Sequence, residues 1–186
     1  MSFPYKKKNH VPLPPGLYRA VLILFIFLFF PLLDGWAQGN YAIQANIIYR
    51  FTKYVNWPDE KKAGDFVIGI VGDTPLYDEL TQFTTNKTAG GRAIVVKKFS
   101  PSASSYNCQI LFISDEESGS IKRIATCTSG MPMLLVSESE GVARKGSCIN
   151  FVIVDDHLKL EINKTAIEKR MLDIATELLN LGIIVK

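Results

Sequence analysis

The segment Phe66–Val71 (FVIGIV) restricts the fold of this chain more than any other short stretch. A nearly continuous apolar run of this length is typical of a strand that is covered on both faces, as in parallel sheets flanked by helices. Thr74-Pro75 follows closely and supplies a cap residue and a first-turn proline for a short helix over 76–83. The chain therefore contains at least one buried strand followed by a helix, which is the repeating unit of an α/β protein.

Further apolar segments alternate with helical patterns. Residues 93–96, 110–113 and 133–136 predict three more strands, and residues 43–55 and 117–125 predict helices. In the first of these helices, Ile43, Ile47, Phe51 and Val55 recur at helical spacing and predict its apolar face. The alternation favours a mostly parallel sheet with helices on both sides.

The pattern changes after residue 147. Residues 148–154 and 158–162 predict an antiparallel hairpin that turns at Asp155-Asp156, and the second strand alternates apolar and polar residues, so one of its faces is exposed.

Beyond the hairpin, Thr165 and Glu168 have the spacing of a capping box. Apolar residues then recur at helical spacing from Ile167 through Met171 to Leu178, and they predict one continuous last helix that ends at Gly182. Together these elements predict an α/β fold: a three-layer sandwich with a mixed, mostly parallel sheet and a C-terminal antiparallel hairpin followed by a helix.

Residues 1–37 predict a secretory signal peptide. Lysines precede an apolar run over 20–33, and the small residues Gly35 and Ala37 stand at the −3 and −1 positions of a cleavage site. The run is shorter than the roughly 20 apolar residues of a membrane-spanning helix, which favours cleavage over an uncleaved anchor. We expect residues 1–37 to be removed and residues 38–186 to form a single exported domain.

The basic net charge belongs to this targeting segment. Residues 1–37 hold four of the 21 Lys and Arg residues and one of the 18 Asp and Glu residues, so the remaining 149 residues are formally neutral. A neutral domain lacks the electrostatic surface that nucleic-acid binding requires, and we expect no nucleic-acid partner.

The stretch Tyr49–Pro58 (YRFTKYVNWP) combines aromatic and basic residues and has two interpretations. It forms either an exposed aromatic platform for a ligand or a core helix whose end is set by Trp57-Pro58, since a residue before proline disfavours helical angles. The helical spacing of Phe51 and Val55 favours the core helix.

Candidate catalytic and metal-binding residues are scarce. After residue 37 the only histidine is His157, beside Asp155 and Asp156 at the predicted hairpin turn. Consecutive residues on a turn rarely converge on one metal ion, so a solvated turn is the simpler interpretation. We expect no catalytic residues, no bound metal and no cofactor.

Acidic residues follow the predicted parallel strands. Asp73, Asp115 and Glu138, with Glu116 and Glu140, are expected at the carboxyl edge of the sheet, where open α/β proteins bind ligands. They predict either a crevice for a cation or an amine, or helix caps and solvated loops, for which the same residue types are used.

Three cysteines in an exported chain predict one disulfide and one remaining thiol. Cys108 precedes one predicted strand and Cys127 precedes the next, so both lie at the same edge if the two strands are parallel neighbours. We therefore expect a Cys108–Cys127 disulfide, with Cys148 packed as a small apolar residue.

Five segments, in order, resemble the YfiR-like family of periplasmic proteins. They are IQANIIYRFTKYVNWP (43–58), FVIGIVGD (66–73), CQILFIS (108–114), MLLVSESEGVARKGSCINFVI (133–153) and LKLEINKTAIEKRMLDIATELLNLGIIV (158–185). The resemblance identifies Tyr54, Trp57, Pro58 and Asn163 as structural motif residues. The chain differs from the family pattern at Gly146-Ser147, where the family has two glycines.

The resemblance implies a non-enzymatic, homodimeric periplasmic regulator. Such a protein represses the periplasmic sensor domain of an inner-membrane signalling protein, a diguanylate cyclase or a kinase, and an outer-membrane lipoprotein relieves the repression. We expect the partner to contact the exposed face and flank of the hairpin at Arg144, Lys159 and Glu161, unless these are ordinary solvated charges. The alternative function is a periplasmic small-molecule sensor that uses the acidic crevice.

Overall fold

The computed structural model describes residues 34–185. The predicted signal peptide lies almost entirely outside the described residues, and the structure does not test it. Residues Gln38–Lys186 are one compact unit, and the description below concerns that unit.

The centre of the fold is an eight-stranded sheet in the order β10-β8-β7-β6-β5-β2-β4-β3. Its strands are β2 (Phe66–Val71), β3 (Thr88–Ala89), β4 (Arg92–Phe99), β5 (Ile110–Ile113), β6 (Leu134–Ser137), β7 (Ile149–Val154), β8 (His157–Asn163) and β10 (Ile183–Val185). The β7–β8 and β3–β4 pairs are antiparallel, and the remaining neighbours are parallel. A separate small ladder joins β1 (Val55–Asn56) to β9 (Asp173–Ile174).

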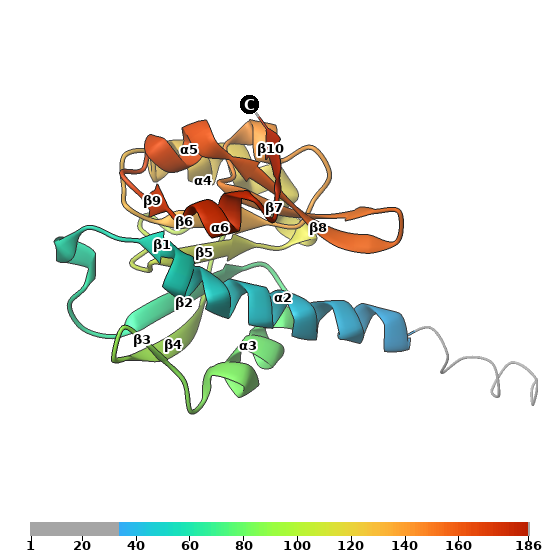
Figure 1. The fold of residues 1–186 in the computed structure, drawn as a ribbon, viewed down its shortest axis with the longest axis horizontal. Helices are drawn as coiled ribbons and strands as arrows, with labels where there is room; N and C mark the ends of the chain where they lie inside the picture. Colours follow the sequence, from blue (N-terminus) through green and yellow to red (C-terminus); the bar gives the residue numbers. More distant parts are fainter. Residues whose placement is uncertain (1–33, 186) are drawn as a thin grey trace, which may run out of the picture. The chain divides into compact units, whose positions relative to one another are not determined.

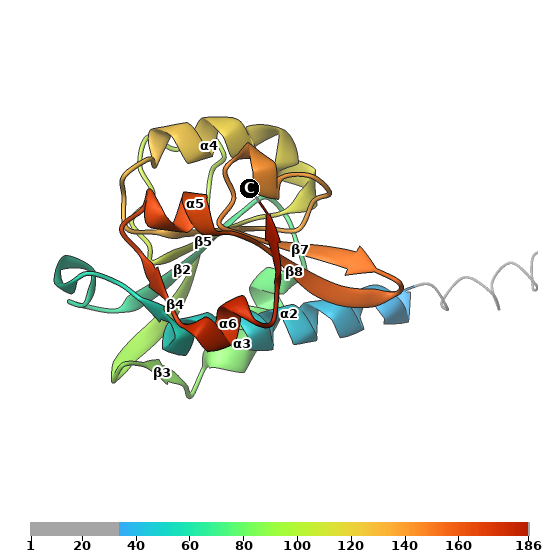
Figure 2. The ribbon, with the colours of Figure 1, turned by 45° about the horizontal axis from the view of Figure 1, so that its top comes forward.

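Helices cover both faces of the sheet. They are α2 (Asp34–Tyr54), α3 (Leu76–Thr84), α4 (Ile121–Cys127), α5 (Lys164–Glu168) and α6 (Thr176–Leu179), with short 3-10 turns η2 (Asp59–Lys61), η3 (Asp115–Ser120) and η4 (Ala143–Lys145). In both ribbon views α4 and α5 lie on one side of the sheet and α2 and α3 on the other (Figures 1 and 2). The predicted α/β sandwich with a mixed, mostly parallel sheet and an antiparallel hairpin is confirmed.

The strand prediction was most accurate where the apolar runs are continuous. β2 and β5 have the predicted bounds, and their residues are almost fully buried because both faces are covered. The hairpin also turns where expected: Asp155 and Asp156 have φ angles of 50° and 58°, as a two-residue hairpin turn requires.

The prediction of one continuous last helix is wrong. The chain forms α5, then β9, then α6, and finally β10, which pairs in parallel with β8. Met171, expected on the apolar face, has a φ angle of 56° and is 60% exposed. A non-glycine residue in the left-handed region interrupts a right-handed helix. Of the apolar residues at helical spacing, Ile167 lies in α5, Leu178 lies in α6, and Met171 lies in neither helix.

The predicted capping box of Thr165 and Glu168 does not begin the helix. The cap of α5 is Asn163, whose Oδ1 accepts a hydrogen bond from the Ala166 N–H at 2.9 Å, while its Nδ2 donates to the Ala143 carbonyl at 2.9 Å. Asn163 thus begins α5 and ties the end of β8 to η4, which gives this predicted motif residue a specific structural role.

The core-facing side of α2 differs from the predicted one. Gln44, Ala45, Ile48 and Phe51 are buried, whereas Ile43 is 51% exposed. The helix is therefore apolar over a wider arc than the core uses, and part of that arc remains open to solvent.

Candidate functional site

The structure brings the predicted acidic residues of the sheet edge together. The Asp115 N–H donates to Glu138 Oε1 at 3.3 Å, and the Asp73 N–H donates to Glu116 Oε2 at 3.1 Å. Lys98 forms an exposed ion pair with Asp73 at 3.3 Å. The carboxylates therefore connect the loops that follow β2, β5 and β6, as the cap-and-loop interpretation expects.

Glu138 is the least exposed of the predicted crevice acids. Gln44 Nε2, on α2, donates to its Oε2 at 3.2 Å. Burial raises the pKa of Glu138 above the usual glutamate value, while the hydrogen bonds from Gln44 and the Asp115 backbone act in the opposite direction. Burial, followed by the charge of Glu138, also raises the pKa of the nearby Tyr41 hydroxyl.

This edge retains hydrogen-bonding capacity. Gln44 Oε1, Ser114 Oγ and Ser139 Oγ are buried and have no hydrogen-bond partner among the described residues. Thr74 does act in capping, because its Oγ1 accepts from the Leu76 N–H at 3.3 Å at the start of α3.

The residues predicted to bind a partner do not form one surface. Lys159 on β8 and Arg144 in η4 line two different hollows. Glu161 is half-buried, and its Oε2 accepts from Nδ2 of the buried Asn150 at 2.9 Å. Because Asn150 also accepts from Ser137 Oγ at 2.7 Å, Glu161 belongs to the network that joins β6, β7 and β8.

Lys159 contributes to an apolar groove that the sequence did not predict. This α2–β8 groove has a volume of about 510 Å³, and the side chains that characterise it are Ile43, Ile47, Arg50, Leu158, Lys159, Leu178 and Leu181. Leu181 is 66% exposed and Ile43 is 51% exposed, although both belong to residue types that are usually buried. Contiguous exposed apolar side chains with a charged rim are typical of protein-interaction sites.

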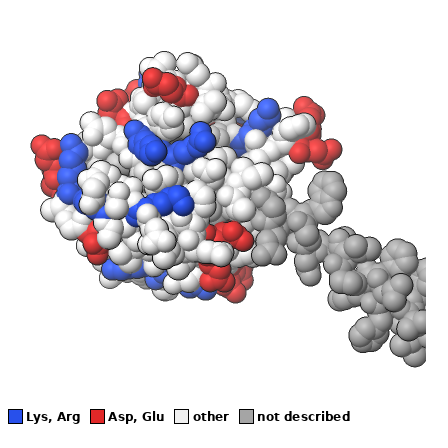
Figure 3. Space-filling model, turned by 60° about the horizontal axis from the view of Figure 1, so that its bottom comes forward, with Lys and Arg blue, Asp and Glu red and all other residues white. Residues whose placement is uncertain are grey.

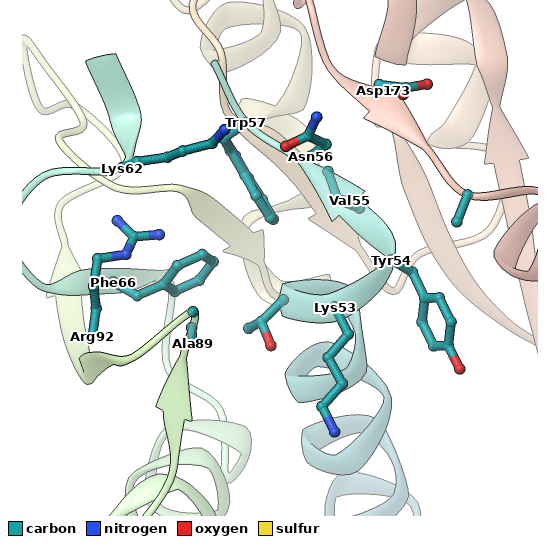
Figure 4. Close-up of a pocket in the computed structure, with 13 residues that line it drawn as sticks. Lys53, Tyr54, Val55, Asn56, Trp57, Lys62, Phe66, Ala89, Arg92 and Asp173 are labelled. Atoms are coloured by element: carbon teal, nitrogen blue, oxygen red, sulfur yellow. The ribbon is translucent and has the colours of Figure 1, made fainter. Parts of the chain in front are cut away.

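The aromatic stretch that ends α2 lies beside a separate hollow of about 450 Å³. In Figure 4, Trp57 and Phe66 point into it, with Lys62 and Arg92 on one side and Tyr54 and Asp173 on the other. Trp57 is only 4% exposed, its ring meets Phe66 edge-on with 5.1 Å between centroids, and its Nε1 donates to the Gln109 carbonyl at 3.2 Å. This burial supports the packed helix end over the exposed platform.

Neighbouring motif residues also hold the end of α2 in place. The Tyr54 carbonyl accepts from the Ala175 N–H at 2.8 Å, next to the β1–β9 ladder, and the Pro58 carbonyl accepts from the Lys61 N–H at 2.9 Å as η2 begins. Basic side chains surround this region: Arg92 lies over the Phe66 ring at 5.1 Å, and Lys53 lies over Tyr49 at 5.5 Å. Figure 3 shows Lys and Arg side chains near the middle of the face it views.

The three cysteines are free thiols in the structure. Cys108 is buried against Met133, with 3.5 Å between sulfurs, and burial raises its pKa to about 12. Cys127 is exposed and its Sγ donates to the Ile124 carbonyl at 3.3 Å. β5 and β6 are parallel neighbours, as the disulfide argument assumed, and the Cys108–Cys127 pairing stays a prediction.

Within residues 34–185, no helix combines the length and the apolar character needed to cross a membrane. The same part of the chain holds no cluster of three or more His, Cys, Asp or Glu side chains arranged to bind a metal ion.

The sequence model of the YfiR/HmsC-like family matches residues 41–183. The matched range includes most of α2, the aromatic helix end, the acidic sheet edge, the hairpin and the α2–β8 groove. A search of the curated proteins finds no match.

Proposed function

We propose that this chain, which belongs to the YfiR/HmsC-like family, binds the periplasmic domain of an inner-membrane diguanylate cyclase and holds that enzyme inactive. The family is generally regulatory rather than catalytic, and membership suggests a periplasmic regulator in cyclic-di-GMP signalling. The family resemblance further suggests a homodimer and an outer-membrane lipoprotein that competes for the regulator. Export by cleavage of residues 1–37 is part of this proposal.

The α2–β8 groove is the observation that carries the proposal. A partner helix with an apolar stripe would bury Ile43, Ile47 and Leu181, which the fold itself leaves partly exposed. Burying these side chains supplies the main favourable term in such an association, roughly 25 cal/mol for each Å² of apolar surface removed from water.

The charges at the groove indicate the chemistry of the partner. Arg50 and Lys159 are exposed, and neither pairs with a carboxylate among the described residues. A partner segment with acidic residues beside its apolar stripe would complement them, and such pairs mainly affect specificity and association rate. The proposed interface therefore includes Lys159, whereas Arg144 and Glu161 lie outside the groove.

Repression requires more than binding. A regulator shifts a two-state sensor only through its different affinities for the active and inactive states. The groove must therefore fit a partner surface that is accessible or ordered chiefly in the inactive cyclase.

Binding of the purified domain to the periplasmic domain of the cyclase tests this function. We expect Ile43→Asp and Lys159→Glu each to weaken binding at least tenfold, or about 1.4 kcal/mol, without lowering the melting temperature. Met131→Asp is the matched control, because Met131 is an exposed apolar residue outside the groove. If Ile43→Asp and Lys159→Glu bind the cyclase domain as tightly as Met131→Asp does, the partner docks elsewhere.

A further inference from the structure

A third hollow, of about 370 Å³, lies beside α4, α5 and η4. Four basic residues line it, Arg144, Lys145, Lys169 and Arg170, together with Ser129 and Thr165. None of the described residues that line this basic hollow is acidic.

Arg170 is the buried member of the basic hollow and is only 3% exposed. Its Nη1 donates to the Thr128 carbonyl at 2.9 Å, and its Nη2 donates to Thr128 Oγ1 at 3.1 Å and to the Ala125 carbonyl at 3.4 Å. These neutral acceptors orient the guanidinium at the C-terminal end of α4, where a cation is favourable, but they carry no full negative charge. A buried cation without an anionic partner is unusual, because removing a charge from water is costly.

The other three cations of the hollow also lack acidic partners in the described part of the chain. The ion pairs in the described part of the chain are Lys62–Asp59, Lys98–Asp73 and Lys164–Glu168. None of them involves a basic residue of the hollow. Arg144, Lys145 and Lys169 are exposed, so their side chains can move toward or away from the buried guanidinium. Like charges that face one hollow repel each other, and an anion placed between them would turn this repulsion into attraction.

The wall of the hollow has a defined shape. Gly146 has a φ angle of 116°, and a Cβ at this position would lie 2.8 Å from the Ala125 Cβ. The absence of a side chain lets the loop after η4 approach α4 closely, and Lys145 and Arg170 line the same hollow. Asn163, through its hydrogen bond to the Ala143 carbonyl, holds η4 from the other side.

We propose that the basic hollow is a binding site for a small phosphate-bearing anion. Phosphate offers several oxygen acceptors and close to two negative charges, which suits one guanidinium fixed by its neighbours and three mobile cationic side chains. The exposed hydroxyls of Ser129 and Thr165 supply further donors to a phosphate oxygen. The site is lined by different residues from the α2–β8 groove and does not depend on the proposed function.

Isothermal titration of the whole domain with inorganic phosphate, pyrophosphate and glycerol phosphate tests the site, with succinate as a carboxylate comparison. We expect saturable binding of at least one phosphate compound, tighter than that of succinate. The paired variant Arg144→Gln with Lys169→Gln should weaken it at least tenfold, while the melting temperature without ligand is unchanged. Lys97→Gln with Lys122→Gln is the control, because both lysines are exposed and lie outside the hollow.

The relative affinities identify the source of the anion. Tighter binding of glycerol phosphate than of inorganic phosphate points to a phosphate monoester, and the reverse order points to free phosphate. Equal weakening by the two double variants would mean non-specific charge attraction and would overturn the site. The absence of saturable binding by every phosphate compound would also overturn the site. Tighter binding of succinate than of the phosphate compounds would overturn the phosphate assignment.

Discussion

Trp57→Ala distinguishes a packed helix end from a ligand platform. The Trp57 ring is 4% exposed, packs edge-on against Phe66 and donates its Nε1–H to the Gln109 carbonyl. Truncation removes these contacts and leaves a cavity between the end of α2 and β2. We therefore expect a loss of stability rather than a selective loss of binding.

The expected cost is about 4 kcal/mol, near the middle of the usual range of 3–5 kcal/mol for truncating a buried aromatic side chain. The lost hydrogen bond adds little, because the Gln109 carbonyl also accepts from the Leu134 N–H at 2.8 Å and is not left unpaired. For a domain of this size, about 4 kcal/mol corresponds to a fall of roughly 8–16 °C in melting temperature.

Thermal denaturation followed by circular dichroism measures this effect. Trp57→Phe is the matched control: it keeps an aromatic ring in the site but loses the indole N–H, and we expect it to cost less than half as much. A melting temperature of Trp57→Ala within about 2 °C of the wild-type value, together with loss of partner binding, would refute the packing argument.

Other expectations follow from the targeting segment, the cysteines and the sheet edge. Intact-mass measurement of periplasmic protein should show a chain that begins at Gln38, and a full-length product retained in the membrane would contradict the signal peptide. Peptide mapping without reductant should find Cys108 linked to Cys127, a bond worth about 3 kcal/mol for a loop of this size, whereas a link to Cys148 would exclude that pairing. The folded protein holds the Glu138 proton more tightly than the unfolded chain, so Glu138 favours folding at low pH, and this contribution is lost as the pH rises through its raised pKa. Unfolding measured at several pH values should therefore show Glu138→Gln gaining stability relative to wild type as the pH rises from about 4.5 toward neutrality. A stability difference that stays constant over this pH range would count against a raised pKa.

The fold class was predictable because its strongest signals are local. The continuous apolar run of β2 and the turn at Asp155-Asp156 each depend on a few adjacent residues. The C-terminal segment was not predictable by the same reasoning, since apolar spacing alone does not show that Met171 adopts a left-handed conformation. The pairing of β9 with β1 and of β10 with β8 competes there with helix formation.

The acidic sheet edge could be anticipated because the acids directly follow predicted parallel strands, and Asp115 and Glu138 do meet there. The α2–β8 groove could not, because α2 is far from β8 and α6 in the sequence and only the tertiary structure places the three elements around one hollow. The apolar spacing of Ile43 and Ile47 predicts core positions, because periodicity alone does not show which part of a wide apolar arc the core covers. The sequence predicts Arg144 as a partner-binding residue, and only the tertiary structure shows that it lines the same hollow as Arg170.

Intracellular cyclic-di-GMP in a strain that lacks the gene tests the central claim most directly. If the protein represses a diguanylate cyclase through the α2–β8 groove, deletion should raise the cyclic-di-GMP concentration. Wild-type protein should restore the original level, and Ile43→Asp should not, although it accumulates to the same amount. An unchanged concentration in the deletion strain, under both inducing and non-inducing conditions, would contradict repression of a cyclase.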